Sequence, residues 1–155
     1  MIKREDFIAE CMTWLGTPYK TLQSCKGIGC DCAGFVYGAM KNVGLLPSDY
    51  LPPRVSSQWY HHKANDVFVE ELRRIGAQQL PMEETRPGDI VSFQYGRAQS
   101  HLVILLPNLK IIHCLAAAKG VVITSGAENA GRAHLTWRLP NLDPPAPIEF
   151  NGRIF

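Results

Sequence analysis

Gly29-Cys30-Asp31-Cys32-Ala33-Gly34-Phe35-Val36 is the stretch that organises the chain, because it places a cysteine where a helix is predicted to begin. Apolar residues then recur at the spacing of one helical face, and Gly44 supplies a stop. The pattern predicts a helix from about Cys32 to Val43. Unpaired N–H groups and the positive end of the helix dipole favour a thiolate there, so we expect a Cys32 pKa below the usual value of about 8.5.

A cysteine at the start of a helix is not by itself a nucleophile. Free cysteine is more often a small buried hydrophobe, so the interpretation of Cys32 depends on what other elements place beside it. A cysteine nucleophile needs a base within hydrogen-bond reach and a third polar group that orients the base. The second half of the chain offers two histidines for these roles.

Strand patterns begin near residue 86, where the hydrophobic period changes. Arg86-Pro87-Gly88-Asp89 has turn chemistry, and short runs rich in β-branched and apolar residues come after it. These runs predict an antiparallel meander with strands at Ile90–Tyr95, His101–Leu106, Lys110–Leu115 and Val121–Thr124.

His101 and His113 lie in adjacent predicted strands among Leu, Ile and Val residues. A three-residue loop at 107–109 would place both rings on one face as diagonal neighbours. A loop of two or four residues would place them on opposite faces. An unpaired imidazole among apolar residues is costly, so a polar group is expected to face them. The remaining histidines are interpreted as exposed or loop residues: His61, His62 and His134.

Helical patterns dominate the first half of the chain. They predict helices at Lys3–Leu15 and Asn65–Gly76 and a short helical piece at Ser56–His62. Residues 20–29 show neither period and are expected to form a loop. Helices that come first and an antiparallel meander that follows indicate an α+β fold.

The 155 residues suit one domain, 1–155, which can bury a core without disulfides. A proline-rich C-terminal extension starts at about residue 139. Four prolines within Leu139–Pro147 exclude a central strand there, and a last short strand is expected at 152–155.

The composition excludes several classes of protein. A net charge of +2 with scattered basic residues argues against nucleic-acid binding. The charged N-terminus does not resemble a signal peptide, and no apolar run is long enough for membrane insertion. Five irregularly spaced cysteines favour a reducing compartment. The expected location is therefore cytoplasmic, or within a virion.

Five motifs, taken in order, carry a resemblance to a known family. They are Gly16-Thr17-Pro18-Tyr19, Gly29 to Val36, Pro87-Gly88-Asp89-Ile90-Val91-Ser92-Phe93, Ser100-His101-Leu102-Val103-Ile104 and Ile111-Ile112-His113. In order and spacing they resemble the motifs of the NlpC/P60 cysteine peptidases, from about Phe7 to Thr124. The loop Ser24–Cys30 makes the chain similar to stand-alone domains of phage and prophage tail modules, which would make phage tail proteins its partners.

The resemblance implies a papain-like α+β fold in which N-terminal helices pack on a small antiparallel sheet. It implies that Cys32 is the nucleophile, His101 the general base and His113 the residue that orients the base. Tyr19 matches a tyrosine that helps to bind substrate or the oxyanion, and Asp31 matches the acidic residue before the nucleophile. The implied activity needs no metal or cofactor, and it cleaves stem peptides of peptidoglycan, typically between γ-D-glutamate and a diamino acid.

Two positions depart from the family pattern. Ala33 stands where a serine is usual, which removes a hydroxyl that could contact substrate. Val103 replaces a usual glycine and narrows the space beside the His101 strand. Both changes bear on the identity of the substrate and leave the three predicted catalytic residues intact.

Other interpretations stay open at the level of sequence. Three cysteines (Cys25, Cys30, Cys32) and three residues of the strands (His101, His113, Cys114) could build a zinc site, although paired Cys-x-x-Cys spacing is missing. Cys25 and Cys30 could form a disulfide or simply pack. The fold could also serve a non-enzymatic tail-assembly component, or a thioester-forming enzyme that transfers its acyl group to an amine.

Overall fold

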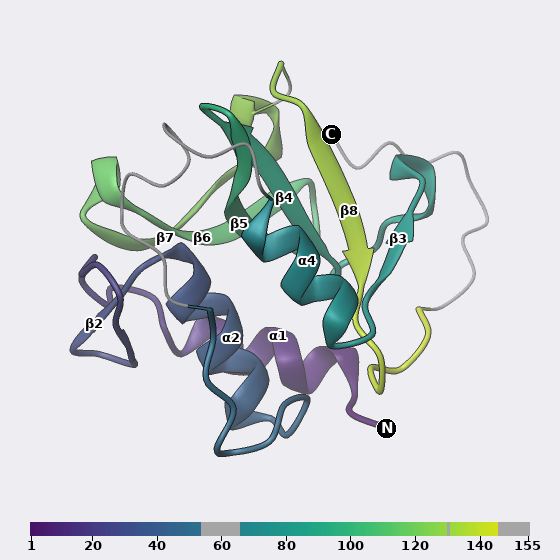
Figure 1. Ribbon diagram of the computed structural model, residues 1–155, viewed down its shortest axis with the longest axis horizontal. Helices are drawn as coiled ribbons and strands as arrows, with labels where there is room; N and C mark the ends of the chain where they lie inside the picture. The colour runs from purple at the N-terminus through teal and green to yellow at the C-terminus, as the bar shows by residue number, and fades with distance from the viewer. Residues whose placement is uncertain (54–65, 130, 146–155) are drawn as a thin grey trace.

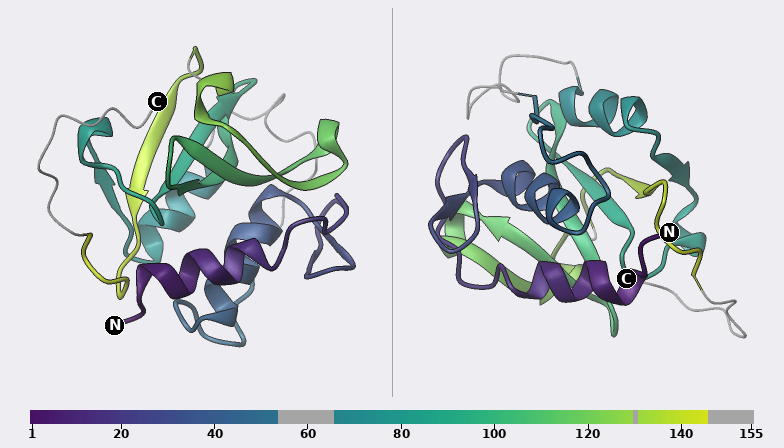
Figure 2. Two further views of the ribbon diagram at one scale, coloured as in Figure 1. Left: turned by 180° about the vertical axis from the view of Figure 1, so that it is seen from behind. Right: turned by 90° about the horizontal axis from the view of Figure 1, so that it is seen from below.

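The computed structural model describes residues 1–53, 66–129 and 131–145. Within these ranges, three α-helices lie against a curved six-stranded antiparallel sheet (Figures 1 and 2). They are α1 (Arg4–Met12), α2 (Cys32–Asn42) and α4 (Val67–Arg74). In Figure 1, α1 and α2 lie below the sheet and α4 crosses in front of it. The α+β class predicted from the sequence is confirmed.

The sheet has six strands in the order β3-β8-β4-β5-β6-β7, and every neighbouring pair is antiparallel. The central meander matches the predicted strands closely, with β5 three residues longer at its start. The strands are β3 (Gln78–Leu80), β4 (Ile90–Tyr95), β5 (Ala98–Leu106), β6 (Lys110–Leu115), β7 (Gly120–Ser125) and β8 (His134–Arg138). Short 3₁₀ turns occupy Met82–Glu84, Ala116–Ala118 and Gly126–Asn129.

Strands β3 and β8 lie outside the meander that the sequence predicts, with β3 at one edge of the sheet and β8 between β3 and β4. Both are short: β3 has three residues, and β8 has five, in which polar and apolar residues alternate with the period of a strand. Residues 20–29, expected as a loop, contain a two-stranded hairpin of β1 (Ser24–Cys25) and β2 (Gly29–Cys30). Two-residue strands leave almost no hydrophobic pattern in a sequence.

Helix α2 begins and ends where its sequence predicts. The Asp31 carboxylate accepts the N–H of Gly34 at 2.7 Å and forms the N-cap. At the other end, Val43 is the C-cap and Gly44 has a φ of +85°, a conformation that favours glycine. Helix α1 is shorter than predicted, because residues 13–16 form turns.

Alternating residues of β5 face two separate clusters of apolar side chains. Leu102, Ile104 and Leu106 belong to the main core, which the helices cover. Val103 and Leu105 belong to a smaller cluster on the opposite face. The complete smaller cluster is Val91, Phe93, Val103, Leu105 and Ile111, with Tyr95 at its edge.

A buried carboxylate fixes the turn that starts β4. Asp89 is fully buried and accepts from Arg4 Nη1 at 3.0 Å, Arg138 Nη2 at 2.8 Å and the Arg86 N–H at 2.9 Å. The neighbouring Gly88, with a φ of +93°, donates its N–H to the carbonyl of Leu105 at 2.9 Å. This motif therefore ties α1 and the strands β4, β5 and β8 together.

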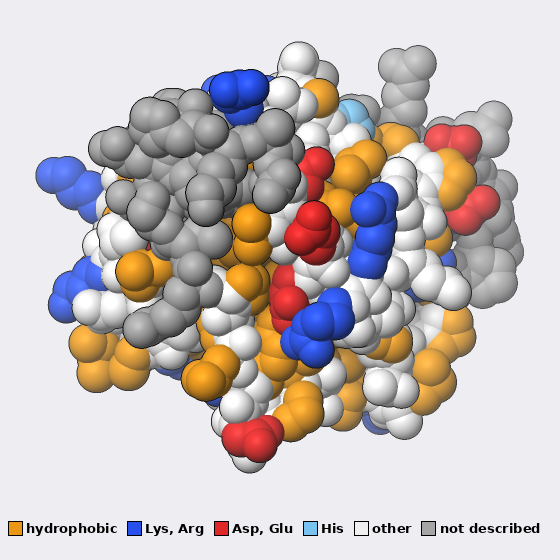
Figure 3. Space-filling view, viewed as in Figure 1, with side chains coloured by type: hydrophobic (Ala, Val, Ile, Leu, Met, Phe, Trp, Pro, Cys, Tyr) orange, Lys and Arg blue, Asp and Glu red, His pale blue; other side chains and the backbone are white. Residues whose placement is uncertain are grey.

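Some predictions fall outside the described residues. They are the short helix at Ser56–His62, the cap at Asn65 and the strand at 152–155. Within the described ranges, no helix has the length and apolar character needed to cross a membrane. In the coloured part of Figure 3, acidic and basic side chains are interspersed around the exposed side of α4.

Candidate active site

Cys32 lies at the first position of α2, and its thiol contacts the backbone of β5. The Sγ atom donates to the carbonyl oxygen of Ser100 at 3.5 Å, and the N–H of Leu102 also interacts with the sulfur. These two residues flank His101. The nucleophile and the base predicted from the sequence are therefore brought together at one place in the fold.

The contact is possible because β5 and β6 separate at this point. Their pairing runs from Leu106 opposite Lys110 to Ile104 opposite Ile112, and it does not continue through Leu102. Leu105 directs its N–H and C=O toward the start of β4, so the even-numbered residues of β5 direct theirs toward the β6 side. The thiol of Cys32 interacts with the carbonyl of Ser100 and the N–H of Leu102, which lie beyond the paired part of β5 and β6.

The two histidines bridge the separated strands. His101 Nε2 and His113 Nδ1 are 2.8 Å apart, and the ring centroids are 5.0 Å apart at 66°. The loop at 107–109 has three residues, as the placement of both rings on one face requires. Both side chains are buried, with 5% and 1% of their surface exposed.

Thr124, which no sequence pattern singles out, completes this hydrogen-bonded chain. His113 Nε2 lies 2.9 Å from Thr124 Oγ1 on β7. With Nε2 of His101 engaged by His113, Nδ1 is the nitrogen of His101 that is left for the thiol. The simplest proton arrangement has His101 Nε2–H donating to His113 Nδ1, and His113 Nε2–H donating to the threonine oxygen.

Burial governs the charge of these groups. It raises the pKa of the Cys32 thiol to about 12, and the nearby Asp31 carboxylate adds to the rise. The N–H groups of Leu102 and Ala33 act in the opposite direction but do not outweigh burial. The prediction of a lowered Cys32 pKa is therefore wrong. Desolvation destabilises the thiolate by more than the N–H groups and the helix dipole stabilise it.

The histidines are also held neutral. Burial lowers the pKa of His101 to about 3, with His113 and Arg132 contributing, and it lowers the pKa of His113 to about 4. At neutral pH the resting site consequently holds a thiol and two neutral imidazoles. His101 is then free to accept a proton.

An aromatic ring covers one face of the His101 imidazole. Tyr95 stacks on it at 4.8 Å and 20°, and the guanidinium of Arg132 lies 4.0 Å from the centre of the tyrosine ring. The Tyr95 hydroxyl donates to Asn129 Oδ1 at 3.0 Å. The strand register could have identified Tyr95, because Phe93 lies opposite His101 and a side chain two residues further shares its face.

Backbone pairing places Tyr19 beside Cys30, two residues before Cys32. Tyr19 forms a parallel bridge with Cys30, while Pro18 forms an antiparallel bridge with Gly120. A Cβ at Gly120 would lie 2.4 Å from the carbonyl oxygen of Thr17, so the close approach requires glycine. Burial, together with the charges of Cys32 and Asp31, raises the pKa of Tyr19, and the phenol stays protonated as a donor.

The structure gives Asp31 a role in the fold. One carboxylate oxygen caps α2 and the other accepts the N–H of Leu22 at 2.9 Å. The Asp31 side chain thus accepts the N–H of Gly34, and the Asp31 backbone carbonyl accepts the N–H of Phe35. Among the described residues the N–H of Cys32 has no hydrogen-bond acceptor, and the N–H of Ala33 interacts with the Cys32 sulfur, so these two groups at the helix start are candidate donors to an oxyanion.

The other cysteines do not join the site as ligands. All five cysteines are free thiols, with Cys25 exposed and Cys30 buried. The Cys114 thiol donates to the carbonyl of Cys30 at 3.2 Å. Within residues 1–53, 66–129 and 131–145, no three His, Cys, Asp or Glu side chains gather as metal ligands. The zinc interpretation therefore gains no support.

Comparisons with known proteins agree with this architecture. The chain is similar to the NlpC/p60 domain of the peptidoglycan hydrolase SagA, with 17% identity over 85% of this chain and 96% of that one and a TM-score of 0.60. It is similar to the P60 domain of an antigen from Mycobacterium avium subspecies paratuberculosis (20% identity, 88% and 93% covered, TM-score 0.57). It is also similar to the peptidoglycan hydrolase RipB from Mycobacterium tuberculosis, with 24% identity over 88% of this chain and 64% of that one and a TM-score of 0.58. No curated protein matches.

At these identities the solved structures establish the fold alone, which is the NlpC/P60 fold. The family model carries more weight, because it matches residues 16–138. That range starts at the turn that brings Tyr19 to the nucleophile and ends with the last residue of β8. The residues that build the site therefore all lie inside the match, and the chain belongs to the NlpC/P60 family.

Proposed function

We propose that this protein is a cysteine peptidase that hydrolyses amide bonds in the stem peptides of bacterial peptidoglycan, of the γ-D-glutamyl-diamino acid type. One observation carries the proposal: the thiol of Cys32 rests on the backbone beside His101, whose Nε2 is held by His113. Family membership and the similarity to two peptidoglycan hydrolases support the choice of substrate.

The neutral resting state defines the first chemical step. His101 Nδ1 removes the thiol proton of Cys32 as the sulfur attacks the scissile carbonyl carbon. The carbonyl oxygen becomes an oxyanion, which the N–H groups of Cys32 and Ala33 stabilise, with Tyr19 as a further donor. One such donor contributes about 3 kcal/mol to the barrier in enzymes where it has been removed.

The remaining steps return the site to its starting state. The imidazolium of His101 gives its proton to the leaving amine as the C–N bond breaks, which leaves a thioester on Cys32. Water then loses a proton to His101 and attacks the thioester carbonyl. The sulfur departs, recovers the proton from His101, and the carboxylic acid product is released. Throughout, His113 accepts the Nε2–H of His101 and stabilises its positive charge.

Defined muropeptides test this proposal directly. The protein is incubated with a tripeptide that contains the γ-D-glutamyl-diamino acid bond, and the fragments are identified by mass. Cleavage should disappear in Cys32→Ala and persist in Cys25→Ala, which removes an exposed thiol instead. Cleavage by Cys32→Ala at the parental rate would refute the assignment. An added amine that appears in the product would indicate acyl transfer in place of hydrolysis.

The proposal includes a phage or prophage tail context. The resemblance of the loop Ser24–Cys30 to tail-module domains supports it. Antibody detection of the protein in purified particles from induced cells tests this part, and its absence from tail-bearing particles would contradict it.

A further inference from the structure

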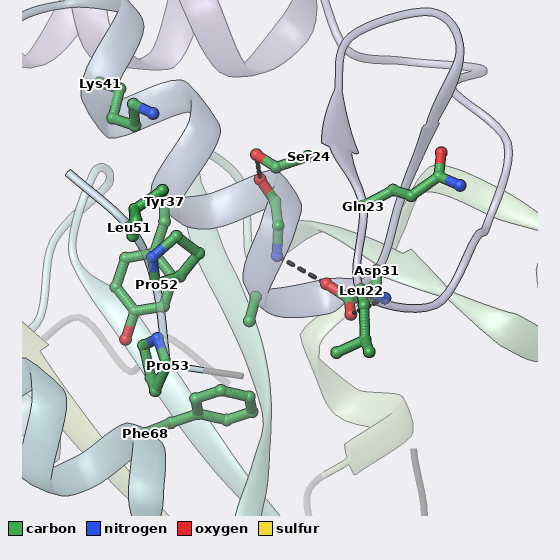
Figure 4. A pocket seen from close by; sticks show the side chains of 12 residues that line it. Leu22, Gln23, Ser24, Asp31, Tyr37, Lys41, Leu51, Pro52, Pro53 and Phe68 are labelled. Atoms are coloured by element: carbon green, nitrogen blue, oxygen red, sulfur yellow. Dashed lines mark hydrogen bonds between the residues drawn. The ribbon is translucent and has the colours of Figure 1, made fainter. Parts of the chain in front are cut away.

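A cavity of about 670 Å³ lies beside the nucleophile, on the side of α2 that faces the loop Leu51–Pro53 (Figure 4). Asp31 and Ala33, the residues on either side of Cys32, both line it. Its floor continues along α2 to Lys41, which is about 12 Å from Ala33 at the helical rise. The volume is within the range of small-molecule sites.

The walls of this cavity are mostly apolar. Leu51, Pro52 and Pro53 form one side, and Phe68 of α4 closes an end. Lys41 is the one cation of the lining and lies at its far end, so near Ala33 the aliphatic, proline and aromatic groups offer no counter-charge to a carboxylate, whose burial among them would be costly. Near the nucleophile, the Asp31 carboxylate would also repel an anion.

One polar group in the cavity has no partner. Tyr37 is fully buried, and its hydroxyl makes no hydrogen bond within the part of the chain that the structure describes. Figure 4 shows the hydroxyl at the end of the cavity near Pro53 and Phe68. Burial raises the pKa of Tyr37 well above its ordinary value, so the hydroxyl keeps its proton. A buried donor without an acceptor is rare in proteins and indicates a missing partner.

We propose that this cavity binds an uncharged, apolar residue of the substrate close to the scissile bond, with a carbonyl of that residue accepting a hydrogen bond from Tyr37. The inference rests on the proposed peptidase function and adds a preference to it. Among stem peptides that share the γ-D-glutamyl-diamino acid bond, those with an apolar residue in this cavity are then better substrates than those with an additional carboxylate there. The small side chain of Ala33 leaves the cavity open toward Cys32.

Binding can be measured without turnover in the Cys32→Ala protein. The full chain, labelled with ¹⁵N, is titrated by NMR with N-acetyl-leucine amide, N-acetylglycine amide and N-acetyl-aspartate amide. We expect the leucine probe to shift the amide signals of Ala33, Gly34 and Tyr37. Its affinity should exceed that of the aspartate probe by about tenfold, since burial of a leucine side chain is favourable.

A matched pair of variants tests the hydrogen bond. Tyr37→Phe keeps the ring and removes the unpartnered hydroxyl, so it should fold normally and weaken binding of the leucine probe about fivefold. Tyr50→Phe removes a hydroxyl that binds Glu71 outside the cavity lining, and it should leave the affinity unchanged. Equal affinity for the leucine and aspartate probes, or an unchanged affinity in Tyr37→Phe, would overturn the proposal.

Failure of this inference differs from failure of the peptidase proposal. A protein that cleaves the muropeptide but does not discriminate among the probes has the proposed activity without this site. A protein that binds the leucine probe through Tyr37 and cleaves no peptide has the site, but the assigned chemistry is wrong.

Discussion

Acidification tests the claim that the two histidines of the candidate site, His101 and His113, are buried as neutral rings. In the unfolded chain a histidine has a pKa of about 6.5, whereas the folded protein lowers the pKa of His101 to about 3 and that of His113 to about 4. Below pH 6.5 the unfolded chain therefore binds more protons, and stability falls as the pH falls. Between pH 7.5 and 5.0 each histidine costs about 2 kcal/mol, or about 4 kcal/mol together.

Urea unfolding at pH 7.5, 6.5, 5.5 and 5.0 measures this loss as a change in the free energy of unfolding. His113→Asn removes one of the two titrating rings, so its loss over the same range should be about 2 kcal/mol. His134→Asn removes a half-buried histidine outside the pair and should keep the wild-type loss. The same pH dependence in the wild type and in His113→Asn would refute the claim that these rings are held neutral.

Four further predictions concern other parts of the structure. Iodoacetamide at pH 7.5 should label the exposed Cys25 before Cys32, since burial holds the pKa of the Cys32 thiol at about 12; mass spectrometry of peptides that showed the reverse order would indicate a preformed thiolate. Asp89→Ala should lower the free energy of unfolding by about 3–5 kcal/mol, because it leaves buried arginine donors unpaired; a loss below 1 kcal/mol in urea unfolding would contradict this. Gly34→Ala should cost about 3 kcal/mol by the same measurement, since a Cβ would lie 1.9 Å from the Gln23 carbonyl oxygen, and unchanged stability would refute that clash. Tyr95→Ala should lower kcat about tenfold with little effect on KM, whereas Tyr95→Phe keeps the ring stacked on the histidine and should keep most of the activity; equal losses in both variants would show that the hydroxyl matters instead of the ring.

The geometry also explains how one sheet serves both packing and chemistry. Where β5 and β6 pair, their side chains fill two apolar clusters. Beyond Ile104 the strands separate, and the backbone groups released there bind the thiol of Cys32 from one side. The hydrogen bond between His101 and His113 spans the same separation. The end of a regular ladder thus creates the site.

Much of this arrangement was predictable from local patterns. The start of α2 follows from the capping carboxylate of Asp31, and its end follows from Gly44. The pairing of His101 with His113 follows from a loop of three residues, because side-chain alternation with a period of two fixes the face of every position. The face that His101 shares with Tyr95 follows from the same alternation across β4.

The tertiary structure decided the protonation state of Cys32 and which distant residues contact the candidate site. The helix start alone predicts a lowered thiol pKa, but packing of α2 against β5 desolvates the thiol and raises its pKa, although Cys32 keeps some exposed surface. Thr124 contacts His113 from the predicted strand β7, and Arg132 contacts the ring of Tyr95 from the turn before β8; no local pattern specifies either contact. The sequence by itself determined which residues share a helix face or a strand face, because that depends on backbone periodicity. Only the tertiary structure decided how far the site is exposed to solvent, because solvent exclusion depends on every element that packs around it.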